Sequence, residues 1–386
     1  MNKRVAIIAA PGCEEGETLT IVDIIRRAEL TCDIVGLEST MVTGAHNITF
    51  EADYIINNEV ADYDMVVLPG GYGGADAMSG SELLLSLLKE MDKQGKCIAA
   101  ICAAALVLDA AGLLEEKKYT CYPTVASKIH SGNRIDDKIV VHGNLITSQG
   151  PATAYAFAYK LVELLGGDAK AVQNRMVYFN AFDETGKTQP AGDLPACAYP
   201  ETSKRAAVLM VEGFEEGETM QIVDLLRRAG IITHTFCFQE NLFVLSMQGM
   251  RVKADKIFSD EIRDYDLIIV PGGRTAGPRL INDPAVIDML QYFNKNNKLI
   301  AAMCSGATVL KAADVIEGKR VTGYTGYAEK LTGAIFCEDV AVFDQNVVTS
   351  QGPATPYPFA FKIMEALGID PNPMKVRLLY ELAGGK

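Results

Sequence analysis

Two cysteines, Cys102 and Cys304, occupy the same place in two copies of one sequence unit, Ile98-Ala-Ala-Ile-Cys102-Ala and Ile300-Ala-Ala-Met-Cys304-Ser. The chain has nine cysteines, and only these two recur. Each follows a short apolar run that predicts a buried strand and precedes a stretch that predicts a helix. A thiol at a helix N-terminus is stabilised as the thiolate by unpaired N–H groups and the helix dipole, which favours a nucleophilic cysteine.

Three further segments recur in the same order around these cysteines. They are Glu14-Glu-Gly-Glu17-Thr18, Pro69-Gly-Gly71 and Ser148-Gln-Gly-Pro-Ala-Thr153, with partners at 215–219, 271–273 and 350–355. Residues 3–28 are identical to residues 204–229 at 15 of 26 positions. The repeat is far longer than the roughly 20 to 50 residues of a solenoid unit, so it indicates a tandem duplication of whole domains.

The elements that position these segments follow from the apolar pattern. In the first copy we expect strands at 5–9, 32–37, 64–68 and 96–101, and helices at 16–28, at 81–93 and after residue 102. Near-continuous apolar strands indicate a mainly parallel sheet covered by helices on both faces. Ligands of such sheets bind beyond the carboxyl ends of the strands, where all four repeated segments would meet.

The chain length of 386 residues agrees with two domains. We expect domain 1 at 1–182, a linker at 183–203 that gathers turn residues, and domain 2 at 204–386. The net charge of -13 opposes binding to nucleic acid or to an anionic membrane. No apolar run approaches a membrane span, and nine cysteines without a CxxC motif favour reduced thiols and a cytoplasmic protein.

Taken together, the four motifs resemble the DJ-1/PfpI superfamily, and in particular its DJ-1, ThiJ and YajL branch. The residues that carry the resemblance are Gly12 to Thr18, Val66 to Gly71, Ala99 to Ala103 and Thr147 to Thr153, with their partners in copy two. The resemblance covers nearly the whole chain and implies two tandem flavodoxin-like α/β domains. Since family members usually form homodimers, it also implies an internal pseudo-dimer, with a higher oligomer left open.

The resemblance assigns the catalytic roles. It pairs Cys102 with Glu17 and Cys304 with Glu218. An ionised carboxylate would raise the pKa of the thiol by repulsion, so the useful arrangement is a protonated glutamic acid that donates a hydrogen bond to a thiolate. The backbone N–H groups of Gly71 and Ala103, and of Gly273 and Ser305, are expected to stabilise the oxyanion formed on attack.

Two positions set limits on this chemistry. Tyr122 and Tyr324 stand where many superfamily members have a histidine, so neither copy has a Cys-His dyad, which argues against a peptidase. Gln149 and Gln351 are neutral, and with the two tyrosines they are expected to line a pocket for uncharged carbonyl groups.

Three functions remain open. The first is cofactor-independent glyoxalase III or deglycase chemistry on a small aldehyde such as methylglyoxal. The second is an oxidant sensor that forms cysteine sulfinic acid, and the third is a protective chaperone, for which no residue speaks directly. No metal is expected, because the histidines have no ligand spacing. Glu14, Glu15 and their partners are interpreted as a solvated helix start.

Overall fold

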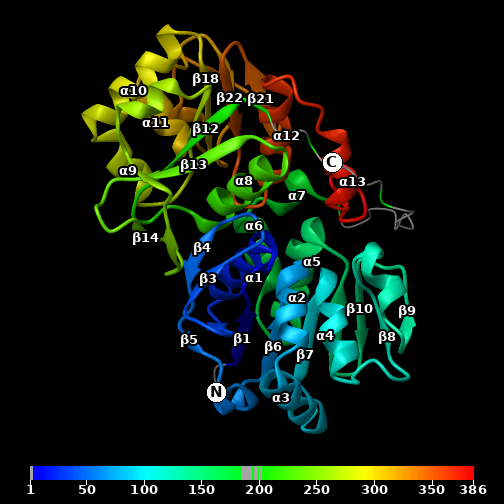
Figure 1. Ribbon diagram of the computed structural model, residues 1–386. Coiled ribbons are helices and arrows are strands. Elements are labelled where there is room, and N and C mark those ends of the chain that lie inside the picture. The colour runs from blue at the N-terminus through cyan, green and yellow to red at the C-terminus, as the bar shows by residue number, and fades with distance from the viewer. Residues whose placement is uncertain (1–2, 184–193, 195–198, 200–201) are drawn as a thin grey trace. The chain divides into compact units, whose positions relative to one another are not determined.

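The computed structural model describes residues 3–183, 194, 199 and 202–386, so most of the predicted linker at 183–203 lies outside the described residues. The described chain divides into two compact units (Figure 1). Among the described residues, unit 1 holds 3–173, 182–183, 194 and 374–385, and unit 2 holds 174–181, 199, 202–373 and 386. Each unit thus combines most of one sequence repeat with a short segment from the end of the other.

Unit 1 is built on a sheet of seven strands in the order β10-β11-β7-β6-β1-β2-β5. All neighbours pair in parallel except β10 and β11, which are antiparallel at one edge. The strands are β1 (Arg4–Ala9), β2 (Thr31–Gly36), β5 (Tyr54–Ile55), β6 (Met65–Leu68), β7 (Cys97–Ile101), β10 (Ile139–His142) and β11 (Leu145–Ser148). The predicted, mainly parallel sheet is therefore confirmed in this unit.

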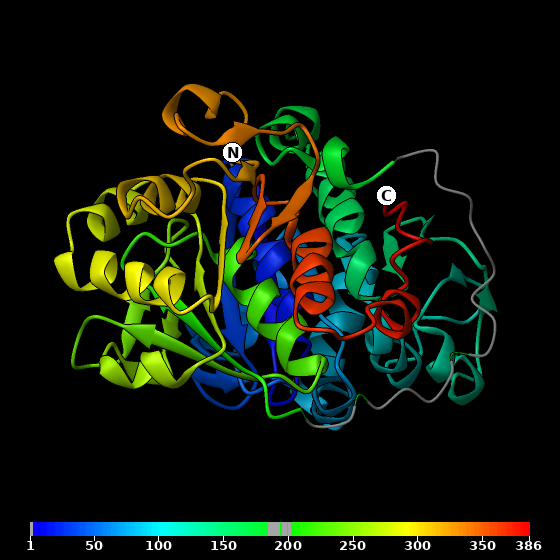
Figure 2. The same ribbon diagram turned by 90° about the horizontal axis from the view of Figure 1, so that it is seen from above.

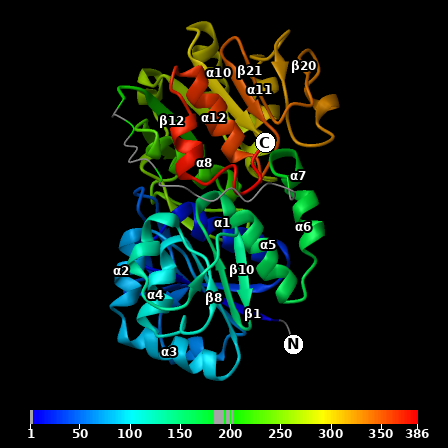
Figure 3. The same cartoon turned by 90° about the vertical axis from the view of Figure 1, so that its right-hand side faces the viewer.

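Helices cover both faces of this sheet. Figure 3 shows α1 and α5 on one face and α2 and α4 on the other, and α1 packs directly against α5. The helices are α1 (Glu15–Arg27), α2 (Tyr72–Ser79), α3 (Glu82–Lys93), α4 (Ala105–Ala110), α5 (Ala154–Leu164) and α6 (Ala169–Arg175), of which α6 ends in unit 2. Smaller elements are the hairpin β3 (Met41–Thr43) and β4 (Thr49–Glu51) and the parallel pair β8 (Lys118–Tyr119) and β9 (Asn133–Arg134).

Unit 2 repeats this architecture, with strand order β16-β13-β12-β17-β18-β22-β21. Figure 2 shows α8 and α12 side by side, as α1 and α5 lie in unit 1. Its strands are β12 (Arg205–Met210), β13 (Ile232–Cys237), β14 (Phe243–Leu245), β15 (Arg251–Lys253), β16 (Lys256–Ile257), β17 (Leu267–Val270), β18 (Leu299–Met303), β19 (Arg320–Val321), β20 (Ile335–Phe336), β21 (Ala341–Asp344) and β22 (Val347–Ser350). Its helices are α7 (Tyr178–Ala181), α8 (Glu216–Arg228), α9 (Ala276–Ile281), α10 (Pro284–Lys295), α11 (Gly306–Ala312), α12 (Pro356–Ala366) and the start of α13 (Asn372–Arg377).

The sequence explains these elements. All four residues of β6 and of β17 are buried, because helices cover both faces of a parallel sheet and leave no polar side. Helix α1 carries Glu15 and Glu17 in its first turn and Arg26 and Arg27 in its last, which suits the helix dipole at both ends. The repeated motifs follow the carboxyl ends of β1, β6 and β7 in unit 1 and of β12, β17 and β18 in unit 2.

The polar contacts of one lysine differ between the units. In unit 1, Lys117 Nζ lies 2.8 Å from Asp92 Oδ1 and forms an ion pair. In unit 2, Lys319 Nζ donates instead to the neutral amide oxygens of Asn294 (2.8 Å) and Asn346 (2.6 Å). Lys319 is only 6% exposed, and burial lowers its pKa, an effect that the charge of Asp344 offsets only in part.

Candidate functional site

The recurring cysteines stand at the predicted elbows. In unit 1, β7 ends at Ile101 and a short 3-10 turn begins at Cys102, followed by α4. The backbone φ is 63° at Cys102 and 54° at Cys304, in the left-handed region that side chains other than glycine rarely adopt. Such strain persists only where surrounding contacts impose it, and it is common at functional sites.

A buried glutamate lies beside each cysteine, as the resemblance implied. The N–H of Gly70 donates to Glu17 Oε2 at 2.8 Å, and the N–H of Gly272 donates to Glu218 Oε2 at 2.8 Å. A Cβ placed on Gly70 would stand 2.6 Å from Glu17 Oε2 and 3.0 Å from Cys102 Sγ. Only glycine fits at this position, because the Glu17 carboxylate and the Cys102 sulfur both lie against it.

The electrostatics of each site disfavour two negative charges. Burial raises the pKa of Cys102 well above its usual range, and the charge of Glu17 raises it further. The pKa of Cys304 is raised for the same reasons, by burial first and then by Glu218. Glu17 is fully buried and Cys102 is 9% exposed, so thiol and carboxyl are best treated as one titrating unit that keeps a proton at neutral pH.

The backbone donors expected for an oxyanion differ between the units. In unit 1 the N–H of Gly71 acts on the Cys102 sulfur and lowers its pKa, against the effect of burial. In unit 2 the N–H of Ser305 has this effect on Cys304. The N–H of Gly273 donates to Ser305 Oγ at 3.0 Å, and that hydroxyl donates to the oxygen of Gly273 at 3.1 Å. Unit 1 has Ala103 at this position, so only unit 2 has a side chain that competes for the glycine N–H.

The predicted pocket tyrosines lie next to the elbow. The N–H of Tyr122 donates to the oxygen of Cys102 at 3.2 Å. Its hydroxyl donates to the oxygen of Arg377 at 2.9 Å, and the hydroxyl of Tyr324 donates to the oxygen of Arg175 at 2.8 Å. In these contacts each tyrosine hydroxyl donates its hydrogen to a backbone oxygen and does not accept one from the thiol. Each tyrosine therefore holds a backbone segment near the site.

The predicted pocket glutamines hold the loops before the last strand pair. Gln149 Nε2 donates to Asp136 Oδ1 (3.1 Å) and to the oxygen of Asp137 (2.9 Å). Gln351 Nε2 donates to the oxygens of Glu338 (3.0 Å) and Asp339 (3.2 Å). Both glutamines are buried, so their amide groups fix backbone near the motif in addition to any contact with a ligand.

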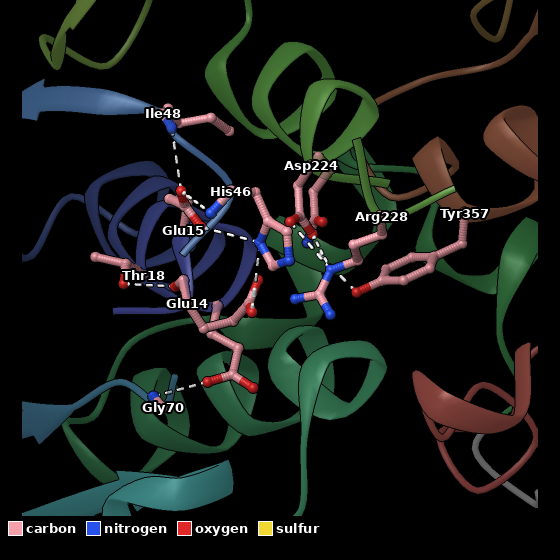
Figure 4. A network of polar contacts seen from close by, with 11 residues as sticks. Glu14, Glu15, Thr18, His46, Ile48, Gly70, Asp224, Arg228 and Tyr357 are labelled. Carbon is pink, nitrogen blue, oxygen red and sulfur yellow. Dashed lines mark hydrogen bonds and ion pairs between the residues drawn. The ribbon is translucent and has the colours of Figure 1, made fainter. Parts of the chain in front are cut away.

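The interpretation of Glu14 and Glu15 as a solvated helix start is wrong. Both are buried, as are Glu215 and Glu216 in unit 2. Figure 4 shows Glu15 with its partners: its Oε1 accepts from the N–H groups of His46 (2.8 Å) and Ile48 (3.1 Å) in the turn between β3 and β4. Glu15 and Glu216 bind the tip of a hairpin in their units, and the signal that could have revealed this role was their identity in both copies.

Four of the other cysteines in the described part of the chain lack the left-handed backbone of Cys102 and Cys304. Cys13, Cys32 and Cys237 are buried, and burial raises the pKa of Cys32 to about 12. Cys121 is buried too, and its pKa is raised mainly by burial. Their environments suit small apolar side chains.

A mainly parallel sheet with an elbow cysteine and a buried glutamate at its carboxyl edge defines a class of α/β proteins with a thiol site. The chain belongs to the DJ-1/PfpI family, whose model matches residues 3–164 and 204–366. The resemblance inferred from the motifs and the tandem flavodoxin-like fold are thereby confirmed. Among the described residues, none of the helices combines the length and apolar character needed to cross a membrane.

Several known proteins are similar to this chain. Protein DJ-1 homolog B of Arabidopsis thaliana is 31% identical over 375 residues, covering 94% of this chain and 84% of that protein. Protein DJ-1 homolog A of the same plant is 29% identical over 374 residues, covering 94% and 95%. The crystal structure of Drosophila melanogaster DJ-1beta is 38% identical, with a TM-score of 0.44, and covers 46% of this chain and 98% of that one. The plant proteins are thus similar across both repeats.

Proposed function

We propose that each unit is a cofactor-independent catalyst of the glyoxalase III or deglycase type that processes reactive carbonyl compounds such as methylglyoxal. The observation that carries the proposal is that the side chains of Cys102 and Glu17 lie together against Gly70. Those of Cys304 and Glu218 lie in the same way against Gly272. A nucleophile and a proton carrier that share a site are what carbonyl addition requires.

The first step of the proposed reaction is carbonyl addition. Glu17 takes the thiol proton, and the sulfur lone pair forms a C–S bond with the aldehyde carbon. The π electrons of the carbonyl move to oxygen, which the N–H groups at the elbow stabilise before it receives the proton held by Glu17. The product of this step is a hemithioacetal.

The second stage completes an internal redox reaction. A proton leaves the hemithioacetal carbon through Glu17 and returns to the neighbouring carbonyl carbon, which yields a thioester of a 2-hydroxy acid. Water then cleaves the thioester, releasing the acid and restoring the thiol. One carbon is oxidised and its neighbour reduced, so the reaction needs no external electron acceptor, and methylglyoxal plus water gives lactate.

This assignment is favoured over proteolysis by the residues around the sulfur. A peptidase needs a base that activates the thiol and an acid that protonates a leaving amine. The side chains of Tyr122 and Tyr324 donate to backbone oxygens, and neither is placed to do this work. Addition to an aldehyde expels no amine, so one carboxyl can carry every proton.

A second candidate function is oxidation of the same cysteines. A thiolate and two molecules of peroxide give a sulfinate and two molecules of water. The contact that favours it is the Gly71 N–H acting on the Cys102 sulfur beside the Glu17 carboxyl, a set of groups that also suits sulfinate oxygens. A chaperone role, the internal pseudo-dimer and the cytoplasmic location stay predictions.

The deciding experiment compares wild type with Cys102→Ser, Cys304→Ser and the double variant for consumption of methylglyoxal and formation of lactate. The proposal expects partial loss in each single variant and complete loss in the double variant. Absence of turnover in the wild type, together with a gain of two oxygen atoms at these cysteines under mild peroxide, would replace the proposal with the oxidation function.

A further inference from the structure

The segment that follows the two glycines of each site differs in charge between the units. In unit 1 this segment is α2, residues 72–79, and its one charged residue is Asp76. Residues 274–281 of unit 2 align with it and hold two charged residues, Arg274 and Arg279. One carboxylate in unit 1 is thus replaced by two guanidinium groups in unit 2, although the Pro-Gly-Gly motif before the segment is identical.

In unit 1, the first residue of this segment joins two stretches of backbone that contact Cys102. Tyr72 directly follows Gly71, whose N–H acts on the Cys102 sulfur. The hydroxyls of Tyr72 and Thr124 lie 2.5 Å apart and form a hydrogen bond. Thr124 follows two residues after Tyr122, whose N–H donates to the Cys102 oxygen at 3.2 Å. We call Tyr72 and Thr124 the unit 1 rim, and it is uncharged.

The unit 2 rim consists of Arg274 and Gly326, at the matching positions. Glycine offers no side chain to hold Arg274. Arg274 is exposed, and it forms no hydrogen bond or ion pair with any residue that the structure describes. The other arginine of the segment, Arg279, is paired with Glu212 at 3.0 Å. Arg274 is therefore the cation of this segment that is free to bind a ligand.

The chain places Arg274 beside the reacting groups. Gly272 lies against both of them, since a Cβ on Gly272 would stand 3.1 Å from Cys304 Sγ and would also contact the Glu218 carboxylate. Gly273 follows, and the Arg274 Cα is only about 3.8 Å from the Cα of Gly273. A long guanidinium side chain that begins there can reach the far end of a carbonyl compound bound at Cys304.

We propose that the two sites take different substrates. Unit 1 takes small uncharged carbonyl compounds, and unit 2 takes carbonyl compounds that carry a carboxylate, which Arg274 binds. A guanidinium matches a carboxylate in both charge and geometry, because two parallel N–H groups can donate to its two oxygens. The inference rests on the proposed function for the reaction itself, and it adds the substrate class of each site.

The substrate of unit 2 is then a 2-oxoaldehyde with a carboxylate at its far end, and 4,5-dioxopentanoate is a suitable probe. Its aldehyde carbon forms the bond to sulfur and is oxidised, and the neighbouring ketone carbon is reduced. Water cleaves the thioester, so 4,5-dioxopentanoate plus water gives 2-hydroxyglutarate. The carboxylate takes no part in these steps and can stay bound to Arg274 throughout, so Arg274 should affect KM more than kcat.

The first measurement needs no turnover. The native full-length chain is alkylated with iodoacetate or with iodoacetamide, which are similar in size and differ in charge, and peptide mass spectrometry follows Cys102 and Cys304 separately. The ratio of the two rates cancels the thiolate fraction of each cysteine, and the net charge of -13 acts on both sites. The iodoacetate to iodoacetamide ratio should be about two- to fivefold higher at Cys304, the effect of an exposed ion pair, and the difference should shrink at high salt.

Variants of the two rims assign this difference to single residues. Arg274→Gln should lower the ratio at Cys304 to the value at Cys102, whereas Arg274→Lys keeps the charge and should retain most of it. Tyr72→Arg should raise the ratio at Cys102, and its control Tyr72→Phe, which removes only the hydroxyl, should not. The proposal is overturned if wild type has equal ratios at both cysteines, or if Arg274→Gln leaves the ratio at Cys304 unchanged.

The second measurement is turnover with unit 2 as the active site. In a Cys102→Ser chain, Arg274→Gln should raise KM for 4,5-dioxopentanoate about two- to fivefold relative to KM for methylglyoxal. An unchanged ratio of the two KM values would refute the binding of the carboxylate by Arg274. Absence of turnover with both substrates would count against the proposed function, and the labelling difference would then still support an anion-selective rim in unit 2.

Discussion

The hydroxyl of Ser305 should make the unit 2 site slower than the unit 1 site. The proposed mechanism uses the N–H of Gly273 for the oxyanion, but Ser305 Oγ already accepts this hydrogen at 3.0 Å. A hydrogen bond inside a protein contributes a net 0.5–1.5 kcal/mol, so giving it up at the transition state costs about 2- to 12-fold in rate. Ser305→Ala should recover this factor.

The assay isolates one site at a time. In a Cys102→Ser background, Ser305→Ala should raise kcat/KM for methylglyoxal by the factor above. In a Cys304→Ser background, Ala103→Ser installs the competing hydroxyl in unit 1 and should lower kcat/KM by a similar factor. An unchanged or lower kcat/KM in the folded Ser305→Ala chain would refute the assignment of Gly273 as an oxyanion donor.

The remaining predictions concern stability and geometry. Asn294→Asp should raise the free energy of unfolding by roughly 1–3 kcal/mol at neutral pH, because it gives Lys319 the charged partner that its counterpart in unit 1 already has; urea unfolding that shows no gain would contradict this. Burial lowers the pKa of His234, so the unfolded chain binds the proton first and stability should fall as pH drops below about 6.5. His234→Asn should lose that part of the pH dependence in the same unfolding assay, and an equal slope in both proteins would count against it. Gly70→Ala should reduce unit 1 turnover by about a hundredfold, since its Cβ would stand 2.5 Å from Cys102 Cβ; Gly80→Ala, with no neighbour closer than 3.6 Å, is the matched control and should keep wild-type turnover.

The sequence was sufficient for the features that depend on local pattern. The apolar run before Cys102 and the helical pattern after it predicted an elbow. In the structure, β7 ends just before Cys102 and α4 follows it. The predicted strand at 64–68 is β6, because residues buried on both faces leave a continuous apolar run. That Glu17 lies beside Cys102 was predicted from the resemblance, because no local pattern reveals a contact between residues 85 positions apart.

The features that local patterns missed depend on contacts between distant segments. Glu15 reads as a surface residue because a charged helix start is usually solvated, yet it binds the backbone of a hairpin about 30 residues away. The contact between Ser305 and Gly273 depends on one side-chain oxygen, which motif alignment does not resolve. The placing of residues 374–385 in unit 1 and of residues 174–181 in unit 2 was missed for the same reason, since a short segment at the end of a repeat gives no local sign of the unit that it joins.

The central claim is that thiol and carboxyl act as one catalytic pair in each unit. The most direct test is kcat/KM for methylglyoxal in the double variant Glu17→Gln with Glu218→Gln, in which both cysteines remain and the amide keeps the size of the carboxyl. The account predicts a loss of about 100- to 10,000-fold, the usual contribution of a general acid or base, with the fold retained. Turnover at the wild-type rate in this variant would contradict the account.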